Sequence, residues 1–218
     1  MTVRIGYEKT GRAKYISHLD MTRCMSRALA RSGLPVWYTQ GFNPHIYMTF
    51  ALPLSLGVES RAETMDFRLE EELPFDQVAA RLNACLPEGI RVLWAGEPVE
   101  KPEAIAWAEY AVRPTYDGGE AAEMGKALQA LWDRPSILVM KHTKKGPKET
   151  DIRPHIRLLD WKGEGTVLSF RLRTAAGPAL TVNPSLLLDR LFEESGRRAD
   201  QADLCRTGVF TGEGKEFR

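Results

Sequence analysis

Basic side chains gather in residues 141–157, KHTKKGPKETDIRPHIR, which hold six Lys or Arg against two acidic residues. Clustered ammonium and guanidinium groups attract phosphate by long-range charge and by hydrogen bonds, the sequence-independent part of nucleic-acid binding. We therefore expect this stretch to bind RNA. Lys144, Lys145 and Lys148 would steer the strand, and Arg153 and Arg157, which flank a proline turn, would hold phosphates. The alternatives are a solvated hairpin loop or a site for another anion.

A second polar cluster begins the stretch 40–60, QGFNPHIYMTFALPLSLGVES. Gly41 permits backbone angles closed to other residues, and Pro44 keeps Asn43 extended. The stretch GFNPH therefore predicts a rigid turn that presents Asn43 and His45. Together with Gln40 they would read a base or a sugar of the RNA.

Aromatic residues surround this turn, and stacking on unpaired bases is one use for them. Strand aromatics more often belong to the core. We expect Phe42 and Tyr47 to be exposed, and Phe50 with one of Trp37 or Tyr38 to be buried.

The start of the first predicted helix offers another candidate site for an anion. A helix N-terminus has free backbone N–H groups, and Arg12, Lys14 and His18 lie close to it in sequence. Ser17 and Asp20 have the spacing of a capping box, which explains both without a ligand. The face of this helix opposite its apolar side carries arginines at i, i+4 and i+8, namely Arg23, Arg27 and Arg31.

Histidines 18 and 45 also suggest an enzyme, because imidazole accepts a proton near neutral pH. With Lys14 and Tyr15 they would form a general acid and base set for RNA cleavage without a metal. Metal binding has little support, because the four histidines show no HxH or HxxxH spacing. No Walker or Rossmann glycine motif is present, so no nucleotide cofactor is expected.

The three cysteines, Cys24, Cys85 and Cys205, are far apart in sequence. This spacing argues against a disulfide framework and against an iron-sulfur motif in this chain, so we expect small buried thiols. No apolar run approaches the roughly 20 residues of a membrane helix, and the start of the chain lacks a signal peptide. The sequence therefore predicts a cytoplasmic protein with no membrane partner.

The elements that position these residues follow a regular order in the first half. Strands are expected at 2–8, 36–38, 62–70 and 90–95, and helices from Ser17 to Gly33 and at 74–85. The strand at 2–8 alternates apolar residues with Arg4, Gly6 and Glu8, which predicts one wet face. Residues 9–14 are expected to form a basic turn.

A linker with two prolines is expected at 98–103, and the pattern then starts again. Strands are expected at 106–112, 137–142, 156–161, 166–172 and 205–211, with helices at 120–132 and 184–194. The sequence thus predicts an α+β fold of two tandem ferredoxin-like (βαββαβ) units, each an antiparallel sheet with its helices on one face. The first domain would span 1–97 with an insertion at 40–60. The second would span 104–218 with an extra hairpin and the basic loop 141–157.

The motifs YISHLD, GFNPH and TDIRPHI resemble those of the bacterial radical-SAM-linked proteins, a family with no assigned activity. Members of that family usually have Pro-Lys after the histidine, where this chain has Ile46 and Tyr47. The resemblance implies a radical S-adenosylmethionine (SAM) enzyme as partner. It also implies that S-adenosylmethionine and the iron-sulfur cluster belong to that partner, with no cofactor in this chain.

We therefore expect a non-catalytic module that binds tRNA or rRNA, rather than DNA, and presents it to the radical SAM enzyme for modification or processing. One alternative is a metal-independent ribonuclease or RNA-modifying enzyme that uses His18 and His45. Another is a protein adaptor whose apolar run 50–56 docks onto the radical SAM enzyme.

Overall fold

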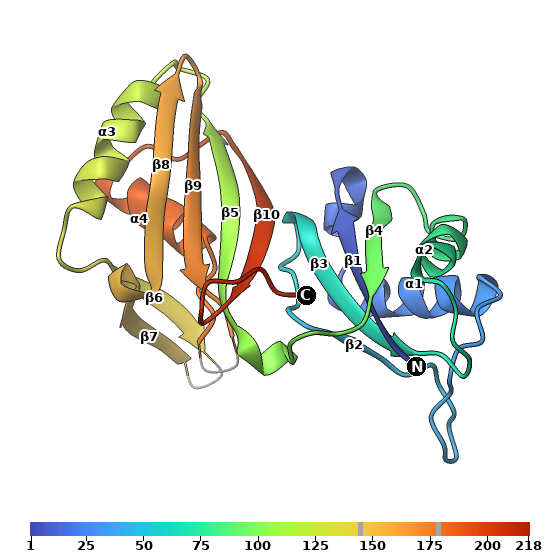
Figure 1. The fold of residues 1–218 in the computed structure, drawn as a ribbon. Coiled ribbons are helices and arrows are strands. Elements are labelled where there is room, and N and C mark those ends of the chain that lie inside the picture. The colour runs from blue at the N-terminus through green and yellow to red at the C-terminus, as the bar shows by residue number, and fades with distance from the viewer. Residues whose placement is uncertain (144–145, 178–179) are drawn as a thin grey trace. The chain divides into compact units, whose positions relative to one another are not determined.

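The computed structural model describes residues 1–143, 146–177 and 180–218. The chain divides into two compact units, which are described separately below (Figure 1). Unit 1 comprises Met1–Ile105 and Lys215–Arg218, and unit 2 comprises Ala106–Gly214. The last four residues thus belong with the first half of the chain. Within the described residues, no helix has the length and apolar character that crossing a membrane requires.

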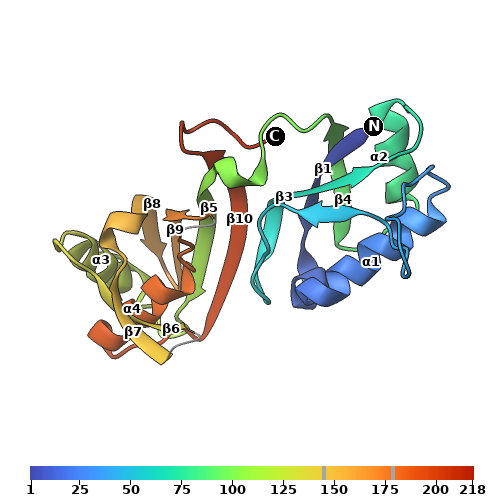
Figure 2. The ribbon, with the colours of Figure 1, turned by 90° about the horizontal axis from the view of Figure 1, so that it is seen from below.

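Unit 1 is an antiparallel sheet with two helices on one face (Figure 2). Its elements are β1 (Thr2–Lys9), the 3-10 turn η1 (Gly11–Tyr15), α1 (His18–Arg31), β2 (Met48–Phe50), β3 (Glu59–Arg68), α2 (Phe75–Asn83) and β4 (Ile90–Gly96). The strand order is β4-β1-β3, with β2 antiparallel to β3. Apolar side chains between the sheet and the helices form the core, among them Val3, Ile5, Met25, Leu29, Met65, Phe67, Val78 and Leu82.

Unit 2 also places two helices on one face of a four-stranded sheet (Figure 2). Its elements are β5 (Ile105–Thr115), α3 (Ala121–Trp132), β6 (Leu138–Thr143), β7 (Gly146–Asp151), β8 (Ile156–Glu164), β9 (Val167–Ala175), α4 (Ser185–Ser195) and β10 (Gln201–Thr211). The strand order is β10-β5-β9-β8, and β6 and β7 form a separate two-stranded sheet. The whole chain is thus a mixed α+β protein with mostly antiparallel strands.

Helix α1 begins where the sequence predicts. The Ser17 hydroxyl accepts a hydrogen bond from the Asp20 backbone N–H at 3.2 Å and donates one to the Asp20 carboxylate at 2.8 Å. The first of these bonds satisfies one of the N–H groups that a helix start leaves free. Two hydrogen bonds, from the Ser17 hydroxyl and the Arg23 side chain, lower the pKa of Asp20.

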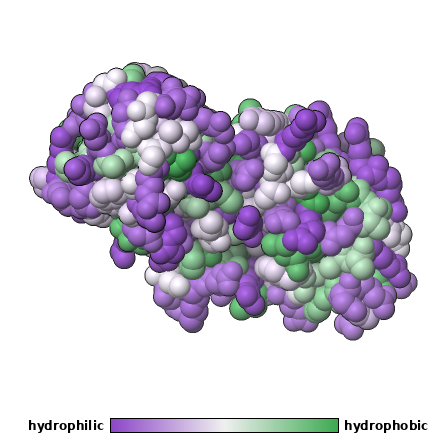
Figure 3. Space-filling view, turned by 90° about the horizontal axis from the view of Figure 1, so that it is seen from above, coloured by the Kyte–Doolittle hydropathy of each residue, from purple (hydrophilic) through white to green (hydrophobic). Residues whose placement is uncertain are grey.

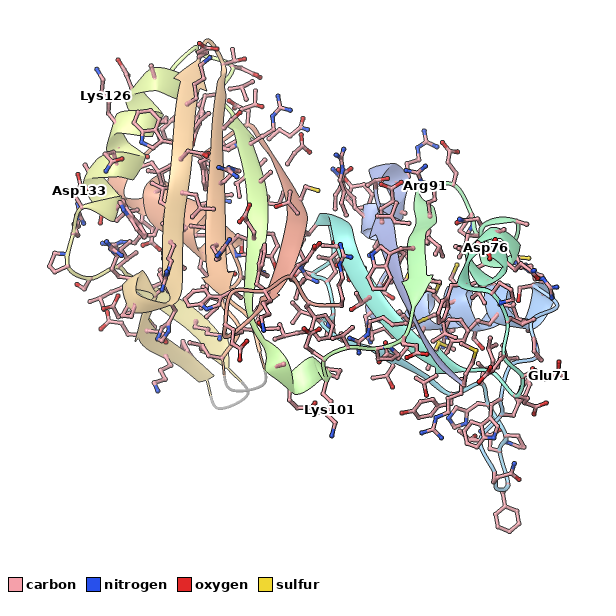
Figure 4. The ribbon with its side chains drawn as sticks, viewed as in Figure 1. Glu71, Asp76, Arg91, Lys101, Lys126 and Asp133 are labelled. Carbon is pink, nitrogen blue, oxygen red and sulfur yellow. The ribbon has the colours of Figure 1, made fainter. Side chains whose placement is uncertain are left out.

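The predicted wet face of β1 is wrong, because Arg4 and Gly6 are buried as fully as their apolar neighbours. The Trp94 ring lies over Gly6, where an added Cβ would come 2.0 Å from the indole nitrogen. Arg4 lies between Asp66 and the ring of Phe217, whose centroid is 4.4 Å from the guanidinium carbon. The sheet face away from the helices is therefore covered at β1. At the edge of the sheet, Arg91 of β4 points outward and pairs with Glu8 at 2.8 Å (Figure 4).

Two predicted strands differ from the structure. Residues 36–38 form only isolated bridges, Val36 to Leu69 and Tyr38 to Ile46. The predicted strand at 137–142 corresponds to β6, but it pairs with β7 instead of joining the sheet. Strand β7 lies in the stretch predicted as a loop, because its sequence GPKETD has none of the β-branched or aromatic alternation of a strand.

Gly163 lets β8 approach the start of α3. A Cβ at this position would lie 2.3 Å from the Ala121 carbonyl oxygen, which is backbone and cannot rotate away. We expect Gly163→Ala to lower the free energy of unfolding by about 1–3 kcal/mol, because the helix must shift. Urea unfolding followed by circular dichroism measures this. Gly212→Ala is the control, since its Cβ would meet only Ala106 at 4.0 Å; equal losses in the two variants would contradict the prediction.

Candidate functional site

A narrow excursion of residues 37–47, here called the arm, projects from unit 1 between α1 and β2 (Figure 1). Backbone hydrogen bonds join its two sides. The Thr39 N–H donates to the His45 carbonyl at 2.8 Å, and Tyr47 N–H donates to the Trp37 carbonyl at 3.4 Å. The arm is therefore a short hairpin-like structure and not an irregular loop.

An arginine between two aromatic rings supports the base of the arm. The Arg68 guanidinium carbon lies 4.8 Å from the ring centroid of Tyr47 and 5.4 Å from that of Trp37. The two rings meet edge to face, with centroids 6.1 Å apart. Ile46 is buried in the core of unit 1. Cation-π contacts and an apolar anchor thus hold the arm to the end of β3.

Every residue at the tip of the arm, from 40 to 45, is exposed. Phe42 has a relative exposure of 112%, the highest among the exposed large hydrophobic residues of the described chain. Gly41 has a φ of 130°, a conformation that L side chains rarely adopt. The predicted exposure of Phe42 is confirmed, whereas Tyr47 and Phe50 are half-buried. Trp37 is half-buried too, and Tyr38 is 43% exposed.

His45 is fixed by the arm itself. Its Nδ1 lies 3.1 Å from the Thr39 hydroxyl and 3.1 Å from the Asn43 carbonyl oxygen. Its backbone N–H donates to the same Thr39 hydroxyl at 3.1 Å. His45 is exposed, and no hydrogen bond joins its Nε2 to a described residue. The tip therefore presents a phenyl ring beside polar groups, which come from Gln40, Asn43 and His45.

The start of α1 gathers the other predicted residues of unit 1. Arg12 is exposed in η1, and the Lys14 ammonium lies 5.5 Å from the centroid of the Tyr15 ring. The exposed His18 ring meets the Phe50 ring edge to face at 5.2 Å. No described contact joins His18 to His45. The described partners of the two imidazoles differ, Phe50 for His18 and Thr39 with Asn43 for His45, and the acid and base set stays a prediction.

In the basic stretch of unit 2, the arginines are engaged by tryptophans. The Arg153 guanidinium carbon lies 3.6 Å from the centroid of the Trp132 ring, and its Nε donates to the Trp132 carbonyl at 3.1 Å. The exposed Arg157 lies over the Trp107 ring at 5.0 Å. Lys148 is exposed on β7, and Lys144 and Lys145 lie outside the described residues.

The sequence did not identify Arg68 as the support of the arm. Arg68 is 21 residues from Tyr47 in sequence, and only the pairing of β2 with β3 brings the two together. An arginine near two aromatic residues in space leaves no trace in sequence spacing. Among the described residues, no group of three or more His, Cys, Asp and Glu side chains is placed to hold a metal ion.

The fold defines the class of the protein as mixed α+β, and a solved structure shares it. A chain in the crystal structure of a Cbf5-Nop10-Gar1 complex is similar with a TM-score of 0.52 and 12% sequence identity. The similarity covers 95% of this chain and 48% of that chain, so this chain spans about half the length of its structural relative. No curated protein matches the sequence.

The family is defined by a sequence model that matches residues 2–184. The chain belongs to this family, which is described as uncharacterized proteins conserved in bacteria (DUF2344).

Proposed function

We propose that this chain is a non-catalytic RNA-binding module in which the arm contacts an unpaired base. The observation that carries the proposal is the full exposure of Phe42 at the tip of an arm whose base is anchored. Burying an aromatic ring away from water is favourable in free energy. A ring that stays exposed on an anchored arm therefore indicates a surface that contacts a partner. Proteins that bind single-stranded RNA stack bases on such rings.

The composition of the tip favours a base over an apolar protein pocket. The side chains of Gln40, Asn43 and His45 donate and accept hydrogen bonds beside the ring, and all three are exposed. These groups match the polar edges of a base, whereas an apolar pocket would leave them unpaired. Residues 37–47 contain no Lys, Arg, Asp or Glu, so the arm would contact bases and leave the phosphates to other residues.

Exposed basic residues in each unit are suited to the phosphates. Arg12 lies beside the start of α1 in unit 1, and Lys148 and Arg157 are exposed in unit 2. In the same proposal Lys14 and His18 extend the basic surface of unit 1. Arg153 would act mainly by stiffening the turn before β8, because its guanidinium lies against Trp132.

The partner in this proposal is a radical SAM enzyme of the bacterial cytoplasm, and its support is the resemblance of the sequence motifs. The chain would present tRNA or rRNA to that enzyme, which would carry S-adenosylmethionine and the iron-sulfur cluster. The order β4-β1-β3-β2 in unit 1 and β10-β5-β9-β8 in unit 2 supports the interpretation of both units as ferredoxin-like.

Substitution of Phe42 by alanine tests the proposal. We expect Phe42→Ala to weaken RNA binding by about 1–3 kcal/mol, roughly 5- to 150-fold in Kd, because one stacked base loses its platform. The measurement is fluorescence anisotropy with labelled bacterial tRNA and, separately, labelled rRNA fragments. Stability should stay within about 0.5 kcal/mol of the wild type, since a fully exposed side chain makes few contacts.

Val99→Ala is the matched control, because Val99 is also exposed, at 75%, and lies outside the arm. It should bind RNA as the wild type does. The proposal fails when the wild type binds neither tRNA nor the rRNA fragments. It also fails when Phe42→Ala and Val99→Ala bind RNA with the same affinity.

A further inference from the structure

A groove on unit 1 lies between the solvent side of α1 and the turn after α2. It has a volume of about 440 Å³ and is lined by Asp20, Arg23, Cys24, Arg27, Arg31, Cys85, Leu86 and Pro87. This volume is in the range of small-ligand sites. The arm begins a few residues after α1 ends, so it follows the last arginine of the groove closely in sequence.

The groove carries three guanidinium groups against one carboxylate. The carboxylate of Asp20 pairs with Arg23 at 3.1 Å, and both side chains are about 60% exposed, so solvent screens this pair. Arg31 donates to the Cys85 carbonyl at 3.0 Å, which keeps its positive charge in the groove. No described residue forms a hydrogen bond or an ion pair with the exposed Arg27. The groove therefore has a net positive charge and one guanidinium available for an anion.

The spacing of the arginines indicates the shape of that anion. Residues four apart on a helix are separated by about 6 Å along its axis, so Arg23 and Arg31 lie about 12 Å apart with Arg27 between them. In a row of this length, each guanidinium group can bind a different phosphate of one polymer. A single phosphate would contact only part of the row.

We propose that this groove binds a linear phosphate polymer along the row Arg23, Arg27 and Arg31. The identity of that polymer rests on the proposed function: it is the backbone of the RNA strand whose base stacks on the arm. The α1 row thus supplies to unit 1 the phosphate contacts that the uncharged arm lacks. Inorganic polyphosphate has the same chemistry and is the other source of such a ligand.

The three cysteines provide a readout of whether the groove is occupied. Cys24 and Cys85 line the groove, whereas Cys205 lies in unit 2, and all three are half-buried. Burial raises the pKa of Cys24, and the nearby Arg31 and Arg27 partly offset this rise. We therefore expect slow alkylation of Cys24 by a maleimide, at a rate that depends at about pH 8 on access to the thiol.

The experiment measures alkylation of each cysteine by mass spectrometry, with no ligand, with tRNA and with inorganic polyphosphate. We expect tRNA to slow alkylation of Cys24 and Cys85 severalfold and to leave Cys205 unchanged. Arg27→Gln should weaken this protection and lower the salt dependence of RNA binding by about 0.7 in the slope of log K against log salt. Lys126→Gln is the matched control, because Lys126 is exposed on α3 of unit 2 and points away from the sheet (Figure 4).

The outcomes separate this inference from the proposed function. When tRNA binds in a Phe42-dependent way but leaves the Cys24 and Cys85 rates unchanged, the groove proposal is wrong and the function stands. When polyphosphate protects both thiols and tRNA does not bind, the groove is a phosphate site and the RNA function is wrong. When neither ligand protects them, the groove proposal is overturned.

Discussion

Replacing Arg4 with leucine is expected to lower the free energy of unfolding by about 3–4 kcal/mol, although Arg4 is not one of the proposed ligand contacts. Its Nε and Nη2 bind the two oxygens of Asp66 at 2.6 and 2.7 Å, and its Nη1 donates to the Glu100 carbonyl at 2.8 Å. Arg4 is 1% exposed and Asp66 is 16% exposed. Leucine would leave the Asp66 carboxylate charged and without its partner in a poorly solvated place.

The double variant Arg4→Met with Asp66→Leu distinguishes the buried charge from loss of packing. A buried ion pair replaced by apolar residues of similar volume is often tolerated, so the double variant should recover most of the lost stability. Urea unfolding followed by circular dichroism measures both variants. If the double variant is as unstable as Arg4→Leu, the loss comes from packing against Phe217 and the argument from charge is wrong.

Replacing Lys9 with methionine is expected to cost about 2–3 kcal/mol. Lys9 is 3% exposed, and its ammonium donates to the Ile16 carbonyl at 2.7 Å, just before α1 begins. Glu63 is buried nearby at 5% exposure and attracts the ammonium. Methionine keeps the length of the side chain but removes the donor and the positive charge, so the Ile16 carbonyl loses its donor and the buried Glu63 loses the nearby positive charge. Equilibrium unfolding in urea at neutral pH gives the size of this loss.

The pH dependence gives an independent check on Lys9. Burial lowers its pKa below the ordinary value of 10.5, although the charge of Glu63 acts in the opposite direction. Between the two pKa values the unfolded chain binds more protons at this residue than the folded chain does. The Lys9 contribution to stability therefore improves as the pH rises through that window, and Lys9→Met should lack this gain. Parallel stability curves for the wild type and the variant as the pH rises toward 10.5 would contradict this assignment.

The regular elements were predictable where local chemistry decides them. The alternation of Val3, Ile5 and Tyr7 predicts β1, and the Ser17 cap predicts the start of α1; both are confirmed. The mixed α+β class is confirmed as well. Strand β7 was missed because its pairing with β6 depends on a neighbouring strand and not on its own apolar pattern.

The burial of charged side chains was the main feature that the sequence pattern did not predict. The sequence pattern places Lys9 in a basic turn and Arg4 on a wet face. A lysine or arginine is buried only when it has a partner, and the local sequence shows none for either residue. Those partners, Asp66, Glu63 and the Ile16 carbonyl, come from other elements of the fold. Spacing along one strand cannot reveal them.

The candidate site was predictable at its tip and not at its base. Gly41 and Pro44 restrict the backbone, so an exposed turn with Phe42 at its tip follows from local sequence. The anchor at Arg68 and the groove beside α1 both need residues that lie far apart in the chain. The row Arg23, Arg27 and Arg31 was visible in sequence, but Cys85 comes from the turn after α2.

Ultraviolet crosslinking of the protein to bound RNA tests the role of the arm most directly. Trypsin releases residues 32–61 as one peptide, because the sequence has no Lys or Arg between Arg31 and Arg61, and this peptide carries the whole arm. Mass spectrometry of the crosslinked digest then locates the nucleotide. We predict an adduct on this peptide that disappears in Phe42→Ala. Adducts confined to other peptides, or an adduct that persists in Phe42→Ala, would contradict the role of Phe42 as the platform for a base.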